Sequence, residues 1–329
     1  MNCFKIILLI VIFFISQIQS PAMEIINKKK TGVDLNINIS PAFYINFPLL
    51  ENKFYLESAE IGLQCIYNDR LKVLIDMDFA DIVSQDSDIT SNILHNLYVQ
   101  YKFSEQIKIR TGLFKIPVGE EFFFGNTERP YLDHSMSSDE MLPGWNIGIM
   151  LHGEELLSIL SYAAGIFNTP AETFTEYETP YLSTAGKIAL EGDCFKTLFV
   201  KCGYSVYYNF EDVLTHSLFS HIRWRFHDAQ ALSLFCEYME QRFFNYYWNN
   251  GYFLFLSYRF KNWELYGTGD FFDRNTSDID ADDSIKICAG MRFYILKNKI
   301  QIGAEYAFEN EYEKNDTDHE VSVIMTVVQ

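Results

Sequence analysis

Three consecutive residues, Asp133, His134 and Ser135, are of the types that make up a catalytic triad. A triad works when its side chains converge, with the histidine between the acid and the nucleophile. Adjacent residues of one chain cannot generally converge on one site, so this run does not predict a hydrolase. No other set of residues in the sequence has the types and spacing of a catalytic site, and we expect no enzyme activity.

Metal and nucleic-acid sites are also not predicted. The seven histidines are scattered, without the spacing of a helical metal site. The cysteines that follow Cys3 are odd in number and lack C-x-x-C spacing, which argues against a disulfide framework or a zinc site; they are Cys65, Cys194, Cys202, Cys236 and Cys288. A net charge of −18 argues against nucleic-acid binding, which needs a basic face. We therefore expect no metal and no cofactor.

The elements that position the charged side chains are indicated by an alternation of apolar and polar residues. Val33, Leu35 and Ile37 interleave with polar residues near the start, and Val321 and Val323 do so near the end. A period of two predicts extended strands with one apolar and one polar face. We predict sixteen strands, near residues 32–40, 54–67, 70–79, 94–103, 106–114, 145–152, 156–167, 183–190, 195–208, 215–226, 229–241, 251–260, 262–272, 284–295, 300–308 and 319–328.

The connections between these strands alternate in length. Those after even-numbered strands are tight and carry turn-forming residues; they are Asn68-Asp69, Ser104-Glu105, Gly153-Glu154, Gly192-Asp193, His227-Asp228, Lys261-Asn262 and Lys297-Asn298. Those after odd-numbered strands are mostly long. Short turns on one side and long loops on the other are typical of outer-membrane barrels, whose apolar face is turned outward to lipid. The pattern predicts an all-β fold, a transmembrane antiparallel β-barrel of about sixteen strands.

The start of the chain predicts export. Residues 4–15 form an apolar run behind Lys5, which is shorter than the roughly 20 residues needed to span a bilayer. Ser20 and Ala22 fit the small-x-small pattern of a secretory cleavage site. We therefore expect residues 1–22 to be a signal peptide that is cleaved, with an alternative cut after Ser20. Residues 23–329 form one barrel domain in this interpretation.

The longest connection, near 115–144, carries a run of motifs. It begins with Gly112-Leu113-Phe114-Lys115-Ile116-Pro117-Val118-Gly119-Glu120-Glu121 and continues with Glu128-Arg129. Gly148-Ile149-Met150-Leu151-His152-Gly153 and Gly165-Ile166-Phe167-Asn168 follow. These segments resemble the phosphate-selective porin O and P family over about sixty residues.

The resemblance implies a sixteen-stranded homotrimeric outer-membrane porin that passes small hydrophilic solutes or ions, anions such as phosphate among them. The chain departs from the family at Trp145-Asn146, where relatives carry arginine, and at Thr169, where they often carry glycine. It also ends in Gln329, where an aromatic residue is common. The first departure weakens the expectation of phosphate selectivity, because the planar fork of arginine suits phosphate.

The inward-folded loop is expected to form the constriction of the pore. Its apolar cluster Phe122-Phe123-Phe124 would be unfavourable as an exposed patch. The expected constriction residues are Lys115, Glu120, Glu121, Glu128 and Arg129. The bases expected on the lumen wall are Lys102, Arg110, Lys187, Lys201, Arg223, Arg259, Lys286 and Arg292. A basic wall opposite an acidic loop predicts a weak selectivity with a slight preference for anions, or else charges that are merely solvated.

Two other functions stay open for such a barrel. The acidic outer loops could make it an adhesin or could hold divalent cations, and a barrel enzyme would need a converging catalytic set that the sequence lacks. The expected partners are small hydrophilic solutes or ions and the lipid of a bacterial outer membrane, without nucleic acid.

Overall fold

The computed structural model describes residues 33–38, 45–46, 55–56, 60–79, 93–124, 134–168, 182–210, 213–227, 229–243, 248–274, 283–295, 300–311 and 316–327. Nearly all of them are strands of one antiparallel sheet. The described helical elements are the 3-10 turn η1 (Glu121–Phe123) and the helix α3 (Met136–Met141). No helix in these ranges is long and apolar enough to cross a membrane. The predicted signal peptide lies outside them.

The structure describes eighteen strands, two more than predicted, because β2 lies between the first two predicted segments and the segment 54–67 is divided; the other strands follow the predicted segments. The first half of the chain contains β1 (Val33–Asn38), β2 (Ile45–Asn46), β3 (Tyr55–Leu56), β4 (Glu60–Tyr67), β5 (Leu71–Asp78), β6 (Leu94–Lys102), β7 (Lys108–Lys115), β8 (Trp145–Leu156) and β9 (Leu160–Asn168). The second half contains β10 (Leu182–Phe195), β11 (Leu198–Asn209), β12 (Val213–His227), β13 (Gln230–Phe243), β14 (Trp248–Phe260), β15 (Trp263–Asp273), β16 (Asp283–Ile295), β17 (Ile300–Glu311) and β18 (Asp316–Val327).

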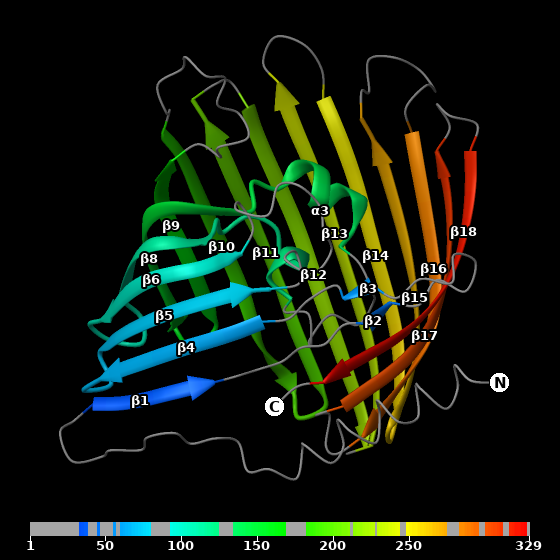
Figure 1. The fold of residues 1–329 in the computed structure, drawn as a ribbon, viewed down its shortest axis with the longest axis horizontal. Helices are drawn as coiled ribbons and strands as arrows, with labels where there is room; N and C mark the ends of the chain where they lie inside the picture. Colours follow the sequence, from blue (N-terminus) through cyan, green and yellow to red (C-terminus); the bar gives the residue numbers. More distant parts are fainter. Residues whose placement is uncertain are drawn as a thin grey trace.

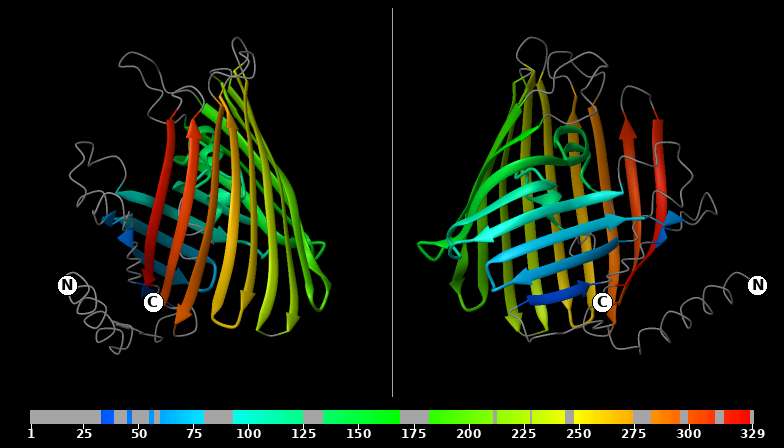
Figure 2. Two further views of the ribbon diagram at one scale, coloured as in Figure 1. Left: turned by 90° about the vertical axis from the view of Figure 1, so that its right-hand side faces the viewer. Right: turned by 60° about the vertical axis from the view of Figure 1, so that its left-hand side comes forward.

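The sheet curves around an interior that contains α3 (Figures 1 and 2). From β4 to β18 each strand pairs with the next along the chain, always antiparallel. At the seam, β1 pairs with β4, whereas β18 pairs with β2. The described pairings therefore form one continuous series that does not join β1 to β18, and the barrel is open at this point.

Three predicted boundaries are wrong. The predicted strand 54–67 is split into β3 and β4. The predicted turn at Gly192-Asp193 lies inside β10, because both residues continue the ladder to β11. The predicted turn at Gly153-Glu154 lies inside β8, and the chain reverses at Leu157 and Ser158, which have positive φ. The predicted turns at Asn68-Asp69 and at Lys261 are confirmed by left-handed backbone at these residues.

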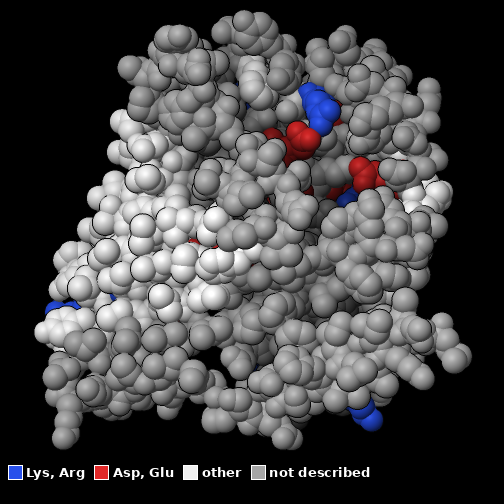
Figure 3. Space-filling model, viewed as in Figure 1, with Lys and Arg blue, Asp and Glu red and all other residues white. Residues whose placement is uncertain are grey.

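The two faces of the sheet differ as predicted. Along β14 buried and exposed residues alternate, with Phe253 and Phe255 buried and Leu254 and Leu256 about half exposed. Ile287 and Met291 are exposed on β16 in the same way, and Ala289 lies between them on the same face. Val73, Ile75 and Met77 on β5 have intermediate exposure. In Figure 3 the described wall at the left is almost entirely uncharged. Large exposed aliphatic side chains in such numbers indicate a surface that contacts lipid.

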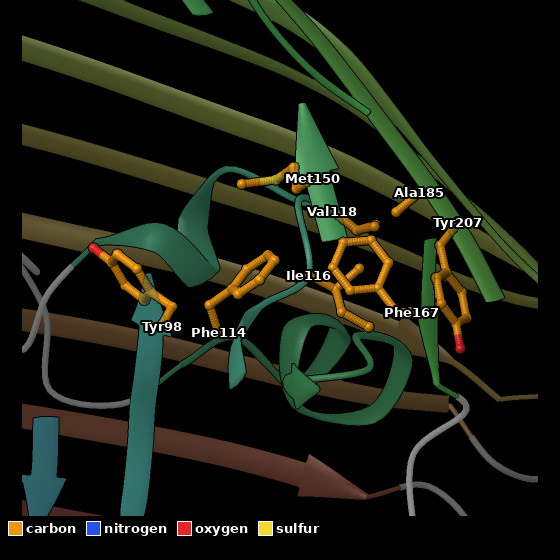
Figure 4. Packing of buried hydrophobic residues seen from close by; sticks show 8 residues of the cluster. All are labelled: Tyr98, Phe114, Ile116, Val118, Met150, Phe167, Ala185 and Tyr207. Carbon is orange, nitrogen blue, oxygen red and sulfur yellow. The ribbon is translucent and has the colours of Figure 1, made fainter. Parts of the chain in front are cut away.

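The inner face near the root of the long connection is packed with apolar side chains. Figure 4 shows this cluster, which consists of Tyr98, Phe114, Ile116, Val118, Met150, Phe167, Ala185 and Tyr207. The ring of Phe167 lies against Gly148 on the neighbouring β8 and against Gly165, two residues earlier on its own strand β9. A Cβ at Gly148 would come 2.3 Å from its ring, and one at Gly165 would come 2.7 Å from it. The glycines of the two motifs therefore make room for this phenylalanine.

Gly148→Ala should destabilise the protein because the added methyl group forces Phe167 out of its position. Overpacking of this kind costs about 1–3 kcal/mol. Gly269→Ala is the matched control, since a Cβ there meets nothing within 4 Å. Guanidinium unfolding in detergent micelles should show a lower midpoint for Gly148→Ala and an unchanged or higher one for Gly269→Ala. Equal midpoints for the two variants would contradict the packing described.

Candidate functional site: a loop bound to the inner wall

The segment after β7 lies along the inner wall. Ile116 and Val118 continue the apolar cluster, and the amide of Gly119 donates to Ser205 Oγ on β11 at 2.9 Å. Gly119 has a φ of +72°, a conformation that glycine adopts readily, and it turns the chain toward β13. The described parts of the connection, 116–124 and 134–144, thus begin with apolar packing and continue with polar contacts.

Glu237 on β13 holds the next two residues. Its carboxylate oxygens accept the backbone N–H groups of Glu120 and Glu121, each at 2.9 Å, and the hydroxyl of Ser217. A buried loop must find acceptors for its amides, since each unsatisfied group costs free energy. Glu237 supplies two of them from the wall.

Glu121 organises the second half of the loop. Its fully buried carboxylate accepts the hydroxyl of Ser135 at 2.7 Å, the amide of Ser135 at 3.2 Å and the hydroxyl of Ser138. Ser135 in turn accepts the Ser138 amide and caps α3. Asp270 on β15 accepts the amide of Met136, which ties the start of α3 to the wall.

These contacts account for two members of the Asp133-His134-Ser135 run. His134 Nδ1 lies 3.2 Å from Glu121, and the Ser135 hydroxyl also binds this carboxylate. Asp133 lies outside the described residues. Ser135 and His134 therefore stabilise the loop by contacting Glu121. The sequence predicted Glu121 at the constriction but did not predict these contacts. Among the described residues, no group of three possible ligands is placed to hold a metal ion.

The charges of the loop and the wall meet directly at Glu120. Its carboxylate lies 2.7 Å from Lys187 Nζ on β10 and 2.6 Å from Lys201 Nζ on β11. Lys187 also donates to the carbonyl of Gly119 at 2.6 Å, and Lys201 lies 3.4 Å from Glu191. Burial would raise the pKa of Glu120, but the two ammonium groups outweigh it and hold this pKa below its usual range. The acid and the bases are thus in contact, not on opposite sides of a gap.

The ring of Phe124 lies against the wall beside these charges. It meets Phe235 edge-on at 5.3 Å and His221 at 6.4 Å between ring centroids. Phe123 is partly exposed, with Lys187 Nζ 4.3 Å from its ring centroid. Phe124 packs against a buried aromatic cluster that includes Phe219 of β12 and Phe235 of β13, in agreement with the reason for expecting the loop inside.

Lys115 is not brought together with Glu120. Lys115 lies on the outer face of the sheet. It is in register with Trp145, which is on the same face of β8 as Ile147, and Ile147 is 56% exposed on the outside. The ammonium group of Lys115 lies 4.5 Å from the Trp145 ring centroid. Glu128 and Arg129, also expected at the constriction, lie outside the described residues.

The bases of β6 and β7 are held by uncharged or local partners. Arg110 donates to Gln100 at 2.9 and 3.2 Å and lies over the ring of Tyr98. Lys102 pairs with Glu105 at 2.7 Å. This pair lies at the short turn between β6 and β7, at the opposite end of β7 from the start of the long loop. On β16, Lys286 lies 3.9 Å from Glu309.

Arginines form a row on the inner face near the short turns of β12 to β16. Arg225 is in register with Ala231, Ala231 with Arg259, Arg259 with Glu264, and Glu264 with Arg292. Arg223 is two residues nearer the loop on β12. Arg259 stacks on Tyr294 and Arg292 is buried, whereas Arg223 and Arg225 are exposed and have no carboxylate within ion-pairing distance among the described residues.

The predicted site residues do not include Ser205 and Glu237, which accept amides of the loop, or Ser217, which donates to Glu237. The alternation along β13 places Glu237 on the inner face. Alternation does not indicate which backbone amides its carboxylate accepts. Asp270, which accepts the amide of Met136, is also absent from the predicted site residues.

No known family matches the chain, and no curated protein matches it. Membership of the phosphate-selective porin family therefore stays a prediction. Solved structures do match. The outer-membrane channel DcaP of Acinetobacter baumannii has 13% identity and a TM-score of 0.61, over 92% of this chain and 99% of that one.

An anion-selective porin from Comamonas acidovorans has 10% identity and a TM-score of 0.64, over 90% of this chain and 100% of that one. The trimer form of OmpT, an outer-membrane protein of Vibrio cholerae, has 11% identity and a TM-score of 0.58, over 91% and 100%. At these identities the similarity concerns the fold. The chain therefore has the fold of the outer-membrane porins.

Proposed function

We propose that the protein is an outer-membrane porin through which small hydrophilic solutes or ions diffuse passively, with a weak preference for anions. The observation that carries the proposal is the loop anchored inside a sheet whose outward face is aliphatic and whose inward face is charged. A hydrated, charged interior removes the cost of moving a polar solute through hydrocarbon. Its place would be a bacterial outer membrane, after removal of residues 1–22.

The preference for anions is argued from the charges that remain uncompensated. Lys187 and Lys201 share the carboxylate of Glu120, and Lys201 also pairs with Glu191, so two positive and two negative charges lie together and contribute little net field. Arg223 and Arg225 lie two and four residues nearer the short turns than His221, which is in register with Lys201. A solute that has passed the loop would meet these two guanidinium groups within a Debye length of about 8 Å at physiological salt.

Phosphate as the solute and a homotrimer as the assembly are further parts of the proposal. The similar porin from Comamonas acidovorans is described as anion-selective, and OmpT of Vibrio cholerae has a trimer form. Arginine is the side chain that suits phosphate, and the exposed pair on β12 supplies two. The resemblance in the loop motifs supports the same assignment.

Conductance across planar bilayers tests the proposed channel. The purified full-length protein should give stepwise openings, with a current proportional to salt concentration. A folded protein, verified by its β circular dichroism and its heat-modifiable migration, that gives no steps would overturn the proposal.

Replacing Arg223 and Arg225 together by glutamine should reduce the preference for anions. The reversal potential under a tenfold salt gradient should move toward cation selectivity, because the uncompensated positive charge has been removed. Arg242→Gln is the matched control, since this arginine lies on the outward face of β13. An identical shift for the control, or no shift for the double variant, would show that the arginine pair does not act on permeating ions.

Glu237→Ala should loosen the loop, because the amides of Glu120 and Glu121 lose their acceptor. An unsatisfied buried group costs about 1–3 kcal/mol, so the unfolding midpoint should fall and the open-channel current should become noisier. Glu191→Ala serves as control because Glu191 is partly exposed and touches only the side chain of Lys201 in the loop's surroundings. Quiet openings and full stability of Glu237→Ala would mean that the loop is held elsewhere.

A further inference from the structure

A polar cluster interrupts the aliphatic outer face on β12, β13 and β14. His216, Glu240 and Asn250 lie in one register row, and Arg242 and Trp248 lie in the row beyond it. Glu240 and Arg242 alternate with Met239 and Gln241, which are buried on the inner side. The cluster therefore faces outward, on the same side of β14 as Leu254 and Leu256.

Its position along the strands is defined by aromatic rings. Tyr238 and Tyr252 are in register, with ring centroids 4.9 Å apart, and Tyr204 lies on the same level two strands away, in register with Leu218. Below this level the outer face continues with Leu232, Leu234, Leu254 and Leu256, and above it lie the cluster and the ends of β13 and β14. In membrane barrels, aromatic rings mark the boundary between hydrocarbon and headgroups. The cluster thus lies at the level of the headgroups, on the side of the long connections.

Internal contacts satisfy the acceptors of the cluster. Glu240 accepts Arg242 Nε with one oxygen and lies 3.1 Å from the Tyr238 hydroxyl with the other. Asn250 Oδ1 also lies 3.1 Å from this hydroxyl. His216 Nδ1 is bonded to the Tyr204 hydroxyl. Both carboxylate oxygens of Glu240 therefore face donors, and the single hydroxyl proton of Tyr238 is shared between Glu240 and Asn250 Oδ1.

The groups left over are donors. Arg242 lies over Trp248, with its Cζ atom 4.4 Å from the ring centroid, and its side chain is 43% exposed. Among the described residues, its two terminal amino groups and the amide nitrogen of Asn250 have no acceptor. A rigid guanidinium fork beside a second N–H donor is suited to the oxygens of a phosphate group.

We propose that this cluster binds the phosphate group of a lipid headgroup in the leaflet on the side of the long connections. The inference rests on the proposed placement of the barrel in a membrane, and it goes beyond the channel function because the cluster is outside the pore. Stacking on Trp248 and the bond to Glu240 fix the plane of the guanidinium group, so little side-chain entropy is lost on binding.

Native mass spectrometry of the full-length protein in detergent would test the proposal. Bisphosphorylated lipid A is the probe, and dephosphorylated lipid A, phosphatidylcholine and inorganic phosphate are the comparisons. The wild-type protein should retain the phosphorylated lipid over dephosphorylated lipid A, which has no phosphate, and over phosphatidylcholine, whose phosphodiester is neutralised by its own choline group. Arg242→Gln should weaken its retention about tenfold, as expected for the loss of one charge-assisted contact, and Arg242→Lys should weaken it less, because it keeps the charge without the fork.

Arg70→Gln is the control, since Arg70 is exposed in the short turn between β4 and β5 at the opposite end of the strands. Equal retention by Arg242→Gln and the wild type, or equal retention of the dephosphorylated lipid, would overturn the proposal. Displacement of the lipid by millimolar inorganic phosphate would overturn the lipid as ligand and indicate a free-anion site. The conductance of Arg242→Gln should be unchanged, so this result and the test of the channel are separable.

Discussion

The structure depends on one constraint: a loop that lies inside the sheet must find acceptors for its backbone amides. Two buried carboxylates meet this need. Glu237 on the wall accepts the amides of Glu120 and Glu121. Glu121 then accepts the hydroxyl groups of Ser135 and Ser138 at the start of α3. The apolar start of the loop packs by shape, but the polar part is placed by these bonds. Everything proposed about the pore follows from where they put Glu120.

The position of Glu120 determines which charges of the protein can act on a solute inside the barrel. A formal net charge of −18 suggests repulsion of anions, yet a permeating ion responds to charges within a few ångströms. Glu120 lies in contact with Lys187 and Lys201, so the loop and the wall compensate each other instead of setting up a field across the opening. The field near the short turns is then set by Arg223 and Arg225. In the proposed porin, the sign of selectivity depends on which bases lack an acid, not on how many there are.

The sequence predicts the strands well because a barrel wall imposes strict alternation, as in β14. It predicts the turns less well: Asn68-Asp69 has the left-handed backbone its residue types favour, but Gly192-Asp193 continues β10, since cross-strand pairing overrides local turn preference. The site is predicted in part. Glu120 and Glu121 were expected at the constriction. Lys115 was also expected there but lies on the outer face, because β7 continues as far as this residue. The partners of Glu237 depend on the path of the loop in space, which the sequence does not indicate.

The most direct test of the account is the reversal potential of Glu120→Gln under a salt gradient at neutral pH. Glutamine keeps the size and one acceptor of the side chain but removes the charge that compensates Lys187 and Lys201. The account predicts a clear increase in anion preference over the wild type, with the channel still opening in steps. An unchanged reversal potential in a folded, conducting variant would contradict the claim that Glu120 compensates the charges of Lys187 and Lys201.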